Sequence, residues 1–234
     1  MTMSKSGLTT YTAITSHKNK GRGKHKIEKI FIHHMAGNLT VQQCGNVFKK
    51  NAASAHYGVN GKNIGCYVDE SDTAWHCGNF AYNQRSIGIE LANDKGASGY
   101  WHVSDTTIAT TIKLIVDICR RNGIKEINYT GDLSGNLCMH CWVVSTACPG
   151  TYLKSKFKYI ADEVNRLLGN YDRIDFKIRV KVSDLNIRTG PSTKHKRKGF
   201  IKPGIYTIVE TKNGWGKLKS GAGWICLKYT TRVK

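Results

Sequence analysis

Apolar and polar positions along the first two thirds of the chain form short blocks, and their period switches between that of strands and that of helices. Residues 27–33 and 87–91 are apolar runs of the length that forms buried strands. Residues 56–69 contain two strand-like stretches around Asn60 and Gly61, a pair with the turn chemistry of a β-hairpin. We therefore expect several short strands in this part of the chain.

Helical periodicity occupies three segments between these strands. Residues 40–48 begin with the Thr-x-x-Gln pattern of a capping box and predict a short helix. Apolar residues recur at helical spacing over residues 104–122, and Gly123 stands where a C-cap belongs. Residues 152–168 repeat the pattern. Strands interspersed with helices predict an α/β or α+β layer architecture for about the first 168 residues.

The pattern changes after residue 170. Strand-like pieces at residues 176–182, 205–211, 215–218 and 223–227 alternate with Gly, Asn, Ser and Pro, and helical periodicity is absent. This arrangement predicts a small all-β barrel. We expect two domains, residues 1–170 and 171–234.

Charge sharpens the contrast between the two parts. The formal net charge is +20, and residues 171–234 contribute 16 Lys and Arg against 4 Asp and Glu, a net of +12. Such a balance indicates a polyanionic partner, which could be nucleic acid, an anionic membrane or an acidic wall polymer. Four of the basic residues cluster in a predicted loop: Lys194, Lys196, Arg197 and Lys198.

The hydrophobic pattern contains neither a membrane-spanning segment nor a signal peptide, which bears on where the protein is made. No apolar run approaches the roughly 20 residues that cross a bilayer, and the polar, basic start of the chain has no apolar signal-peptide region. We expect synthesis in the cytoplasm without a signal peptide, and no membrane insertion. The eight cysteines should then be thiols or metal ligands and not a disulfide framework.

Three residues could hold a metal ion with an open coordination position. His33 ends an apolar strand, while His140 and Cys148 stand eight residues apart on a predicted loop before Pro-Gly. Three protein ligands are typical of catalytic zinc, because the fourth position stays open for water. Cys138 and Cys141 leave an alternative open, a closed structural zinc site, and the histidines could also be ordinary buried side chains.

Five motifs occur in order along the chain and resemble those of one family. They lie at residues 32–37 (IHHMAG), 54–59 (SAHYGV), 74–78 (AWHCG), 86–91 (SIGIEL) and 146–150 (TACPG). Together they are similar to the type 2 N-acetylmuramoyl-L-alanine amidases, which include phage endolysins related to T7 lysozyme, bacterial autolysins and peptidoglycan recognition proteins. The resemblance covers about residues 27–168 and implies a mixed central sheet flanked by helices.

The resemblance implies one Zn²⁺ ion held by His33, His140 and Cys148. His34 should not share the site, since adjacent strand residues point to opposite faces; we expect it to pack or to support the ligands. The cysteine-rich stretch around His140 departs from the family pattern, so Cys138 or Cys141 remains an alternative thiolate ligand.

The resemblance also assigns roles around the metal. Glu90 matches the acidic residue that takes a proton from the attacking water and returns it to the departing nitrogen. Thr146 falls where relatives carry Lys or Thr and would stabilise the oxyanion. His56, Trp75 and His76 are candidates for the lining of the substrate cleft, with core packing as the alternative for Trp75.

The last part of the chain has a signature of its own. Residues 185–192 (LNIRTGPS), 214–218 (GWGKL) and 223–225 (GWI) resemble bacterial SH3 (SH3b) domains, which anchor wall hydrolases to peptidoglycan. Candidates for wall binding are the four-residue basic cluster together with Arg188, Trp215 and Trp224. For both tryptophans, the barrel core is an equal alternative.

The expected function is therefore that of a monomeric N-acetylmuramoyl-L-alanine amidase. It would cut the amide between N-acetylmuramic acid and L-alanine and bind peptidoglycan and anionic wall polymers. A lytic architecture without a signal peptide fits a phage endolysin that acts on the wall after release, with an autolysin as the near rival. A catalytically silent peptidoglycan-binding protein is the alternative. Nucleic-acid binding is not expected, because neither a stacked aromatic platform nor a basic helix accompanies the charge.

Overall fold

The computed structural model describes residues 3–169 and 172–233, and the chain divides into two compact units, Met1–Val164 and Asn165–Lys234. The domain boundary expected between residues 170 and 171 falls on residues outside the described ranges. Each unit has its own sheet and its own core.

A mixed six-stranded sheet organises the first unit, in the order β1-β5-β4-β7-β3-β8. Its strands are β1 (Tyr11–Thr12), β3 (Lys29–His34), β4 (Tyr57–Asn60), β5 (Asn63–Cys66), β7 (Ser86–Leu91) and β8 (Leu137–Met139). The pairings of β3 with β7 and β8, β4 with β7, and β1 with β5 are parallel, whereas the hairpin β4–β5 is antiparallel. A second small sheet pairs β2 (Lys18–Asn19) with β6 (Thr73–Ala74). The predicted mixed sheet is therefore present.

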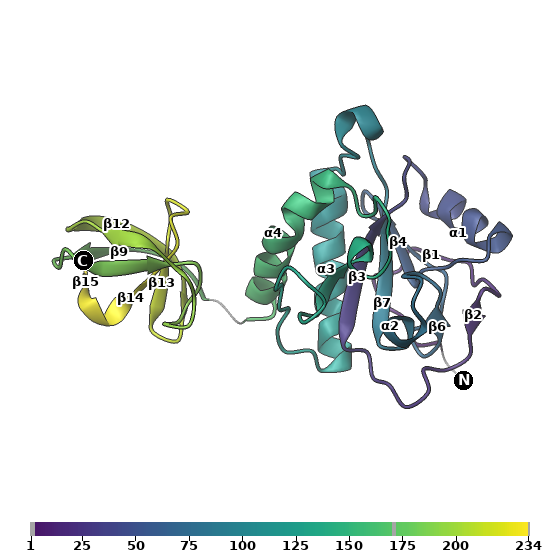
Figure 1. Cartoon of the computed structure of the whole chain (residues 1–234), viewed down its shortest axis with the longest axis horizontal. Coiled ribbons are helices and arrows are strands. Elements are labelled where there is room, and N and C mark those ends of the chain that lie inside the picture. Colours follow the sequence, from purple (N-terminus) through teal and green to yellow (C-terminus); the bar gives the residue numbers. More distant parts are fainter. Residues whose placement is uncertain (1–2, 170–171, 234) are drawn as a thin grey trace. The chain divides into compact units, whose positions relative to one another are not determined.

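Helices cover this sheet on both faces (Figure 1). They are α1 (Val41–Lys50), α2 (Phe80–Gln84), α3 (Asp105–Asn122) and α4 (Thr151–Leu167), with short 3₁₀ turns η1 (Ala97–Gly99) and η2 (His140–Trp142). The capping box at Thr40 and Gln43 is confirmed, with both of its hydrogen bonds formed. Gly123 ends α3 in the left-handed conformation (φ 69°), as a glycine C-cap should. Among the described residues, the structure contains no helix long and apolar enough to span a membrane.

The two central strands place apolar side chains on one face and the site residues on the other. Ile30 and Ile32 of β3, and Ile87 and Ile89 of β7, are fully buried. Because side chains alternate along a strand, the residues between them point to the opposite face. On that second face lie Phe31, His33, Gly88 and Glu90, and the register pairs His33 directly with Glu90.

After the last residues of α4, the regular elements described in the second unit are strands and one 3₁₀ turn, η3 (Leu227–Tyr229). Its strands are β9 (Asp172–Val180), β10 (Leu185–Arg188), β11 (Arg197–Ile201), β12 (Gly204–Lys212), β13 (Trp215–Leu218), β14 (Trp224–Cys226) and β15 (Thr230–Arg232). They form one sheet in the order β11-β10-β14-β13-β12-β9-β15. The core consists of Ile178, Val180, Leu185, Ile201, Ile208, Leu218 and Ile225. The all-β prediction for this part of the chain holds, with β10, β11 and β15 as strands that the pattern did not predict.

Candidate metal centre and active site

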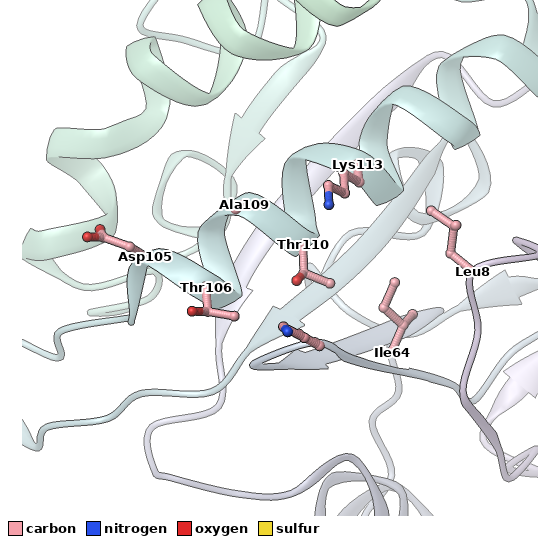
Figure 2. Close-up of a pocket in the computed structure, with 8 residues that line it drawn as sticks. Leu8, Ile64, Asp105, Thr106, Ala109, Thr110 and Lys113 are labelled. Atoms are coloured by element: carbon pink, nitrogen blue, oxygen red, sulfur yellow. The ribbon is translucent and has the colours of Figure 1, made fainter.

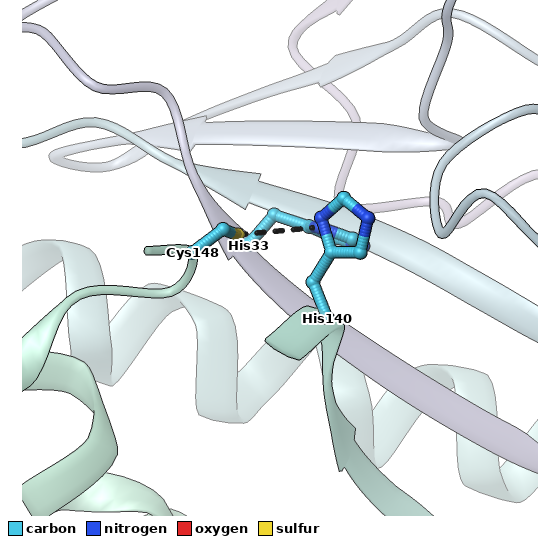
Figure 3. Close-up of side chains that lie close together, drawn as sticks. All are labelled: His33, His140 and Cys148. Carbon is cyan, nitrogen blue, oxygen red and sulfur yellow. Dashed lines mark hydrogen bonds between the residues drawn. The ribbon is translucent and has the colours of Figure 1, made fainter. Parts of the chain in front are cut away.

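Three side chains from distant segments converge at one edge of the first sheet. His33 lies at the end of β3, His140 directly follows β8, and Cys148 belongs to the loop before α4. Because β3 and β8 are parallel neighbours, their carboxyl ends share this edge, where open α/β sheets bind ligands. The potential ligand atoms all lie within 4.8 Å of one another (Figure 3). Cys148 Sγ is 3.5 Å from His33 Nδ1, and the two imidazole centroids are 4.8 Å apart.

Burial sets the protonation of the three groups. Desolvation lowers the pKa of His33 well below its usual value, with smaller contributions from His76 and His140, and burial also lowers the pKa of His140. Burial, followed by the charge of Glu90, raises the pKa of the Cys148 thiol. The imidazoles are therefore neutral and carry lone pairs, and a bound cation would reverse the balance at the thiol and favour the thiolate. Two imidazole nitrogens and one thiolate sulfur suit zinc and leave a fourth position open.

The other cysteines of this region do not join the cluster. Cys138 is fully buried and packs with Phe31 and Cys77 in a separate apolar group. Cys141 is partly exposed. Within the described part of the chain, His33, His140 and Cys148 form the group of three that could hold an ion.

Glu90 lies beside His33 on the neighbouring strand, in register and on the same face of the sheet. Its Oε2 atom is buried and has no hydrogen-bond partner. Burial raises the pKa of this carboxyl to about 8. A shielded, unpaired carboxyl destabilises a fold, and groups with such strongly shifted pKa values concentrate at functional sites. Glu90 therefore has the environment of a proton acceptor poised near neutral pH.

Thr146 is held at the site by the backbone of a ligand residue. Its Oγ1 accepts a hydrogen bond of 3.2 Å from the Cys148 N–H. The hydroxyl proton of Thr146 is thus left for a further acceptor, which is what an oxyanion-stabilising donor requires.

Two expectations for the cleft are corrected by burial. His56 is fully buried: its Nδ1 accepts from the Gly88 N–H at 3.1 Å, and its Nε2 lies 2.6 Å from Arg22 Nη2. His76 is only 7% exposed, and its Nδ1 lies 3.1 Å from His33 Nε2. Both rings are therefore part of the interior of the first unit and not the wall of an open cleft.

The remaining aromatic residues near the motifs have structural partners. Trp75 is partly buried, donates from Nε1 to Asn19 Oδ1 at 2.6 Å and packs against His17. His34 packs edge-on against Trp101, with centroids 5.2 Å apart. Sequence reasoning did not single out Arg22, whose buried guanidinium donates to the carbonyls of the α2–β7 junction. Its position in a glycine- and lysine-rich stretch gave no signal of burial.

The candidates in the second unit separate into supporting and exposed residues. Arg188 Nη1 donates to the carbonyls of Thr193 and His195, so this side chain braces the loop that follows β10. Trp224 is 6% exposed and belongs to the interior, whereas Trp215 is half-buried. All four residues of the basic cluster are exposed, and Arg197 stacks over the Phe200 ring at 4.8 Å.

A hollow of about 530 Å³ lies elsewhere on the first unit, between α3 and the β4–β5 hairpin (Figure 2). Leu8 and Ile64 face Thr106 and Thr110 of α3 across it. Among the described residues that line it there is neither a histidine nor a cysteine, so this hollow offers none of the ligand types found at the metal centre.

The similarities to known proteins lie in the first unit. A family model described as N-acetylmuramoyl-L-alanine amidase matches residues 23–151. The N-acetylmuramoyl-L-alanine amidase CwlL of Bacillus licheniformis is 27% identical over 134 residues, which are 52% of this chain and 34% of that protein. The chain therefore spans about a third of the length of this curated relative.

Solved structures share the fold of the same part. The Staphylococcus aureus hydrolase AmiA in complex with its ligand superposes with a TM-score of 0.53 at 20% identity, over 66% of this chain and 80% of that one. A mutant endolysin from Bacillus subtilis gives 0.50 at 20% identity, over 66% and 97%. PlyL gives 0.51 at 19% identity, over 70% and 97%.

Proposed function

This chain belongs to the N-acetylmuramoyl-L-alanine amidase family, and from that premise we propose that it hydrolyses the amide between N-acetylmuramic acid and L-alanine in bacterial peptidoglycan. The observation that carries the proposal is the convergence of His33, His140 and Cys148 beside Glu90, whose Oε2 atom is buried and has no hydrogen-bond partner. An amide hydrolase needs an electrophile for the carbonyl and a base for water, and this site offers a place for each.

His33, His140 and Cys148 would hold one Zn²⁺ ion. Bound zinc supplies a Lewis acid for the substrate carbonyl and makes water a better nucleophile at neutral pH. The donor set supports this assignment, because the buried imidazole of His33 and the partly buried imidazole of His140 are neutral and the thiol lies within 3.5 Å of a ring nitrogen.

Glu90 takes a proton from the attacking water and returns it to the departing nitrogen. Its shielded Oε2 and its pKa of about 8 in the metal-free protein support a carboxyl that exchanges protons near neutrality. A cation held by the neighbouring ligands lowers this pKa and favours the carboxylate form that the first step needs. Thr146, with its hydroxyl proton unassigned, donates to the developing oxyanion.

The second unit would be an SH3b domain that holds the enzyme on the wall. Its seven strands, small apolar core and exposed cluster of Lys194, Lys196, Arg197 and Lys198 support a basic anchoring module. Such charge attracts peptidoglycan carboxylates and phosphate-bearing wall polymers over long range. We propose the role of an endolysin that is made in the host cytoplasm and acts as a monomer on the wall after release.

The test is product analysis on purified Gram-positive walls. Wild type should release N-terminal alanine without new reducing sugar ends, and treatment with EDTA should abolish the release. Glu90→Gln should lose nearly all activity, while Glu28→Gln, an exposed carboxylate paired with Arg85, should keep it. Reducing ends in place of alanine would identify a glycosidase and overturn the proposal. Wall binding without either product would identify a silent binder.

A further inference from the structure

A line of buried polar side chains runs from the His33 ring into the interior. His33 Nε2 lies 3.1 Å from His76 Nδ1, and His76 Nε2 lies 2.9 Å from Ser86 Oγ. Ser86 Oγ in turn lies 2.6 Å from the Tyr82 carbonyl oxygen. The three side chains are 1%, 7% and 0% exposed, so bulk water does not compete for these contacts. Each contact must therefore hold one proton in a defined place.

The direction of every hydrogen bond follows from the carbonyl end. A carbonyl oxygen only accepts, so the Ser86 hydroxyl donates its one proton to Tyr82. Ser86 Oγ is then an acceptor toward the ring, and His76 must carry its proton on Nε2. A neutral imidazole has a single N–H, which leaves His76 Nδ1 as an acceptor. The proton of the last contact must come from His33 Nε2.

His76 is neutral because its surroundings offer nothing to stabilise a charge. Its ring contacts are with Phe31, His33 and His56, at centroid distances of 5.4, 5.2 and 6.0 Å. None of the described groups in contact with the ring is acidic, and Arg22 next to His56 adds a positive charge to the region. A buried imidazole in this setting stays uncharged.

We propose that His76 is a positioning residue that holds His33 in its Nε2–H tautomer, so that the Nδ1 lone pair faces Cys148 Sγ. The 3.5 Å contact between Nδ1 and Sγ lies on the side of the ring opposite the His76 contact. The inference rests on the proposed function, because it assigns Nδ1 of His33 as the atom that binds the metal. A partner that fixes a ligating histidine's second nitrogen sets both the tautomer and the orientation of the ring.

The strand β7 is built to seat the His76 ring. Ser86 supplies the acceptor, and two residues later Gly88 supplies the space: a Cβ at position 88 would lie 2.5 Å from the ring. No side chain larger than hydrogen fits there without moving His76. The spacing of Ser86 and Gly88 in the SIGIEL motif therefore supports the metal centre indirectly, by fixing the position of the His76 ring.

The first test measures the tautomer directly in the full-length, metal-free protein. Long-range ¹H–¹⁵N correlation spectra of the ¹⁵N-labelled chain distinguish protonated from unprotonated ring nitrogens, and comparison with His33→Gln assigns the signals. We expect His33 and His76 both to carry the proton on Nε2. A proton on His33 Nδ1 would overturn the proposal, whether or not the protein binds zinc.

The second test measures zinc affinity by competition with a chelator. His76→Ala should weaken zinc binding by about 10–100-fold, the usual effect of losing a partner of a metal-binding histidine. His76→Asn should stay within about threefold of wild type, since its Oδ1 can replace Nδ1 as the acceptor. His102→Ala removes a histidine that is paired with Asp94 instead of His33 and serves as the matched control.

Two outcomes of the second test would contradict the proposal. One is a His76→Ala variant that binds zinc as tightly as wild type. The other is an equal loss in the Ala and Asn variants while circular dichroism shows both folded. Absence of zinc binding in wild type would overturn the proposed function instead, and the tautomer measurement would still decide the role of His76.

Discussion

The two units use polar side chains in opposite ways. In the first unit, the proposed site is built on buried groups: His33 is 1% exposed, His76 is 7% exposed, and one oxygen of Glu90 is shielded. The other two proposed ligands, His140 and Cys148, are partly buried. In the second unit, the chemistry-bearing groups are outside, on the exposed loop and strand from Lys194 to Lys198. Buried groups act through fixed geometry and low dielectric, whereas exposed charges act over distance and are screened by salt. Mutations and solution conditions should therefore affect the proposed functions of the two units differently.

The largest difference between the effects on amidase activity and on wall binding is expected from Cys148→Ser. Replacing the proposed thiolate ligand should lower amidase activity on the order of a thousandfold or more, because metal chemistry depends on the full ligand set. Wall binding by the second unit should remain unchanged. Turbidity loss of wall suspensions and pelleting of the protein with walls measure the two properties on the same sample. Parallel loss of binding would show that the units do not act separately.

The second prediction concerns the pH dependence of the stability of the first unit. Because burial raises the pKa of Glu90 to about 8, folding favours its neutral form, and this contribution to stability is complete at pH 4 and is lost as pH rises toward 8. Glu90→Gln keeps a neutral group at all pH values. In EDTA, the variant should therefore gain stability over wild type on going from pH 5 to pH 8, on the order of a few kcal/mol. Thermal melts of both proteins at the two pH values measure this difference.

Glu28→Gln is the control for that experiment, since Glu28 is an exposed carboxylate in an ion pair with Arg85. Its stability relative to wild type should change little between pH 5 and pH 8. An equal change in Glu28→Gln and Glu90→Gln would mean that the effect comes from net charge and not from the buried site.

A smaller effect is expected from the surface of the second unit. Neutralising Lys194, Lys196, Arg197 and Lys198 together to Gln should weaken wall binding at low salt by about tenfold and flatten its salt dependence. Cleavage of a small soluble substrate should not change. Binding isotherms between 50 and 300 mM NaCl provide the measurement, and Lys49→Gln with Lys50→Gln in α1 is the control. Unchanged binding would move the wall contact to another face.

The smallest effect is expected from Thr146→Val. The substitution removes one hydroxyl donor and the acceptor for the Cys148 N–H. The uncharged Thr146 hydroxyl donates one hydrogen bond to the developing oxyanion, so its loss should lower kcat by roughly 2–10-fold and leave KM nearly constant. Thr146→Ser should restore activity, because it keeps the hydroxyl. A full rate in the Val variant would exclude Thr146 from the oxyanion site.

Periodicity predicted the main elements of the first unit because their signals are local. The capping box at Thr40 and the glycine after Asn122 mark helix ends through contacts within one turn. Strands β1, β2 and β6 were not predicted, since each is two residues long and exists only through pairing with a distant partner. The ligand set came from family motifs, because spacing alone left Cys138 and Cys141 open.

The sequence did not reveal the interior network around the site. The resemblance made His76 a candidate for the cleft, together with Trp75 of the same motif. The direction of the His76 side chain, however, depends on how its segment packs against β7, and this packing turns the ring into the interior. Arg22 likewise stands in a basic, polar stretch that predicts exposure, and only the packed structure turns it toward the carbonyls of Asn83, Gln84 and Ser86. Burial of polar groups is a property of the tertiary fold, which periodicity does not report.

The distance along the chain between the converging side chains has a consequence for assembly. Cys148 and His33 are 115 positions apart in sequence and meet only when β3, β8 and the turn before α4 are all in place. An unfinished or nicked first unit therefore has no ready-made site, and tight metal capture should begin only when the sheet closes. If the site holds zinc as proposed, the ion would stabilise fully folded molecules through mass action and would leave incomplete ones open to proteolysis.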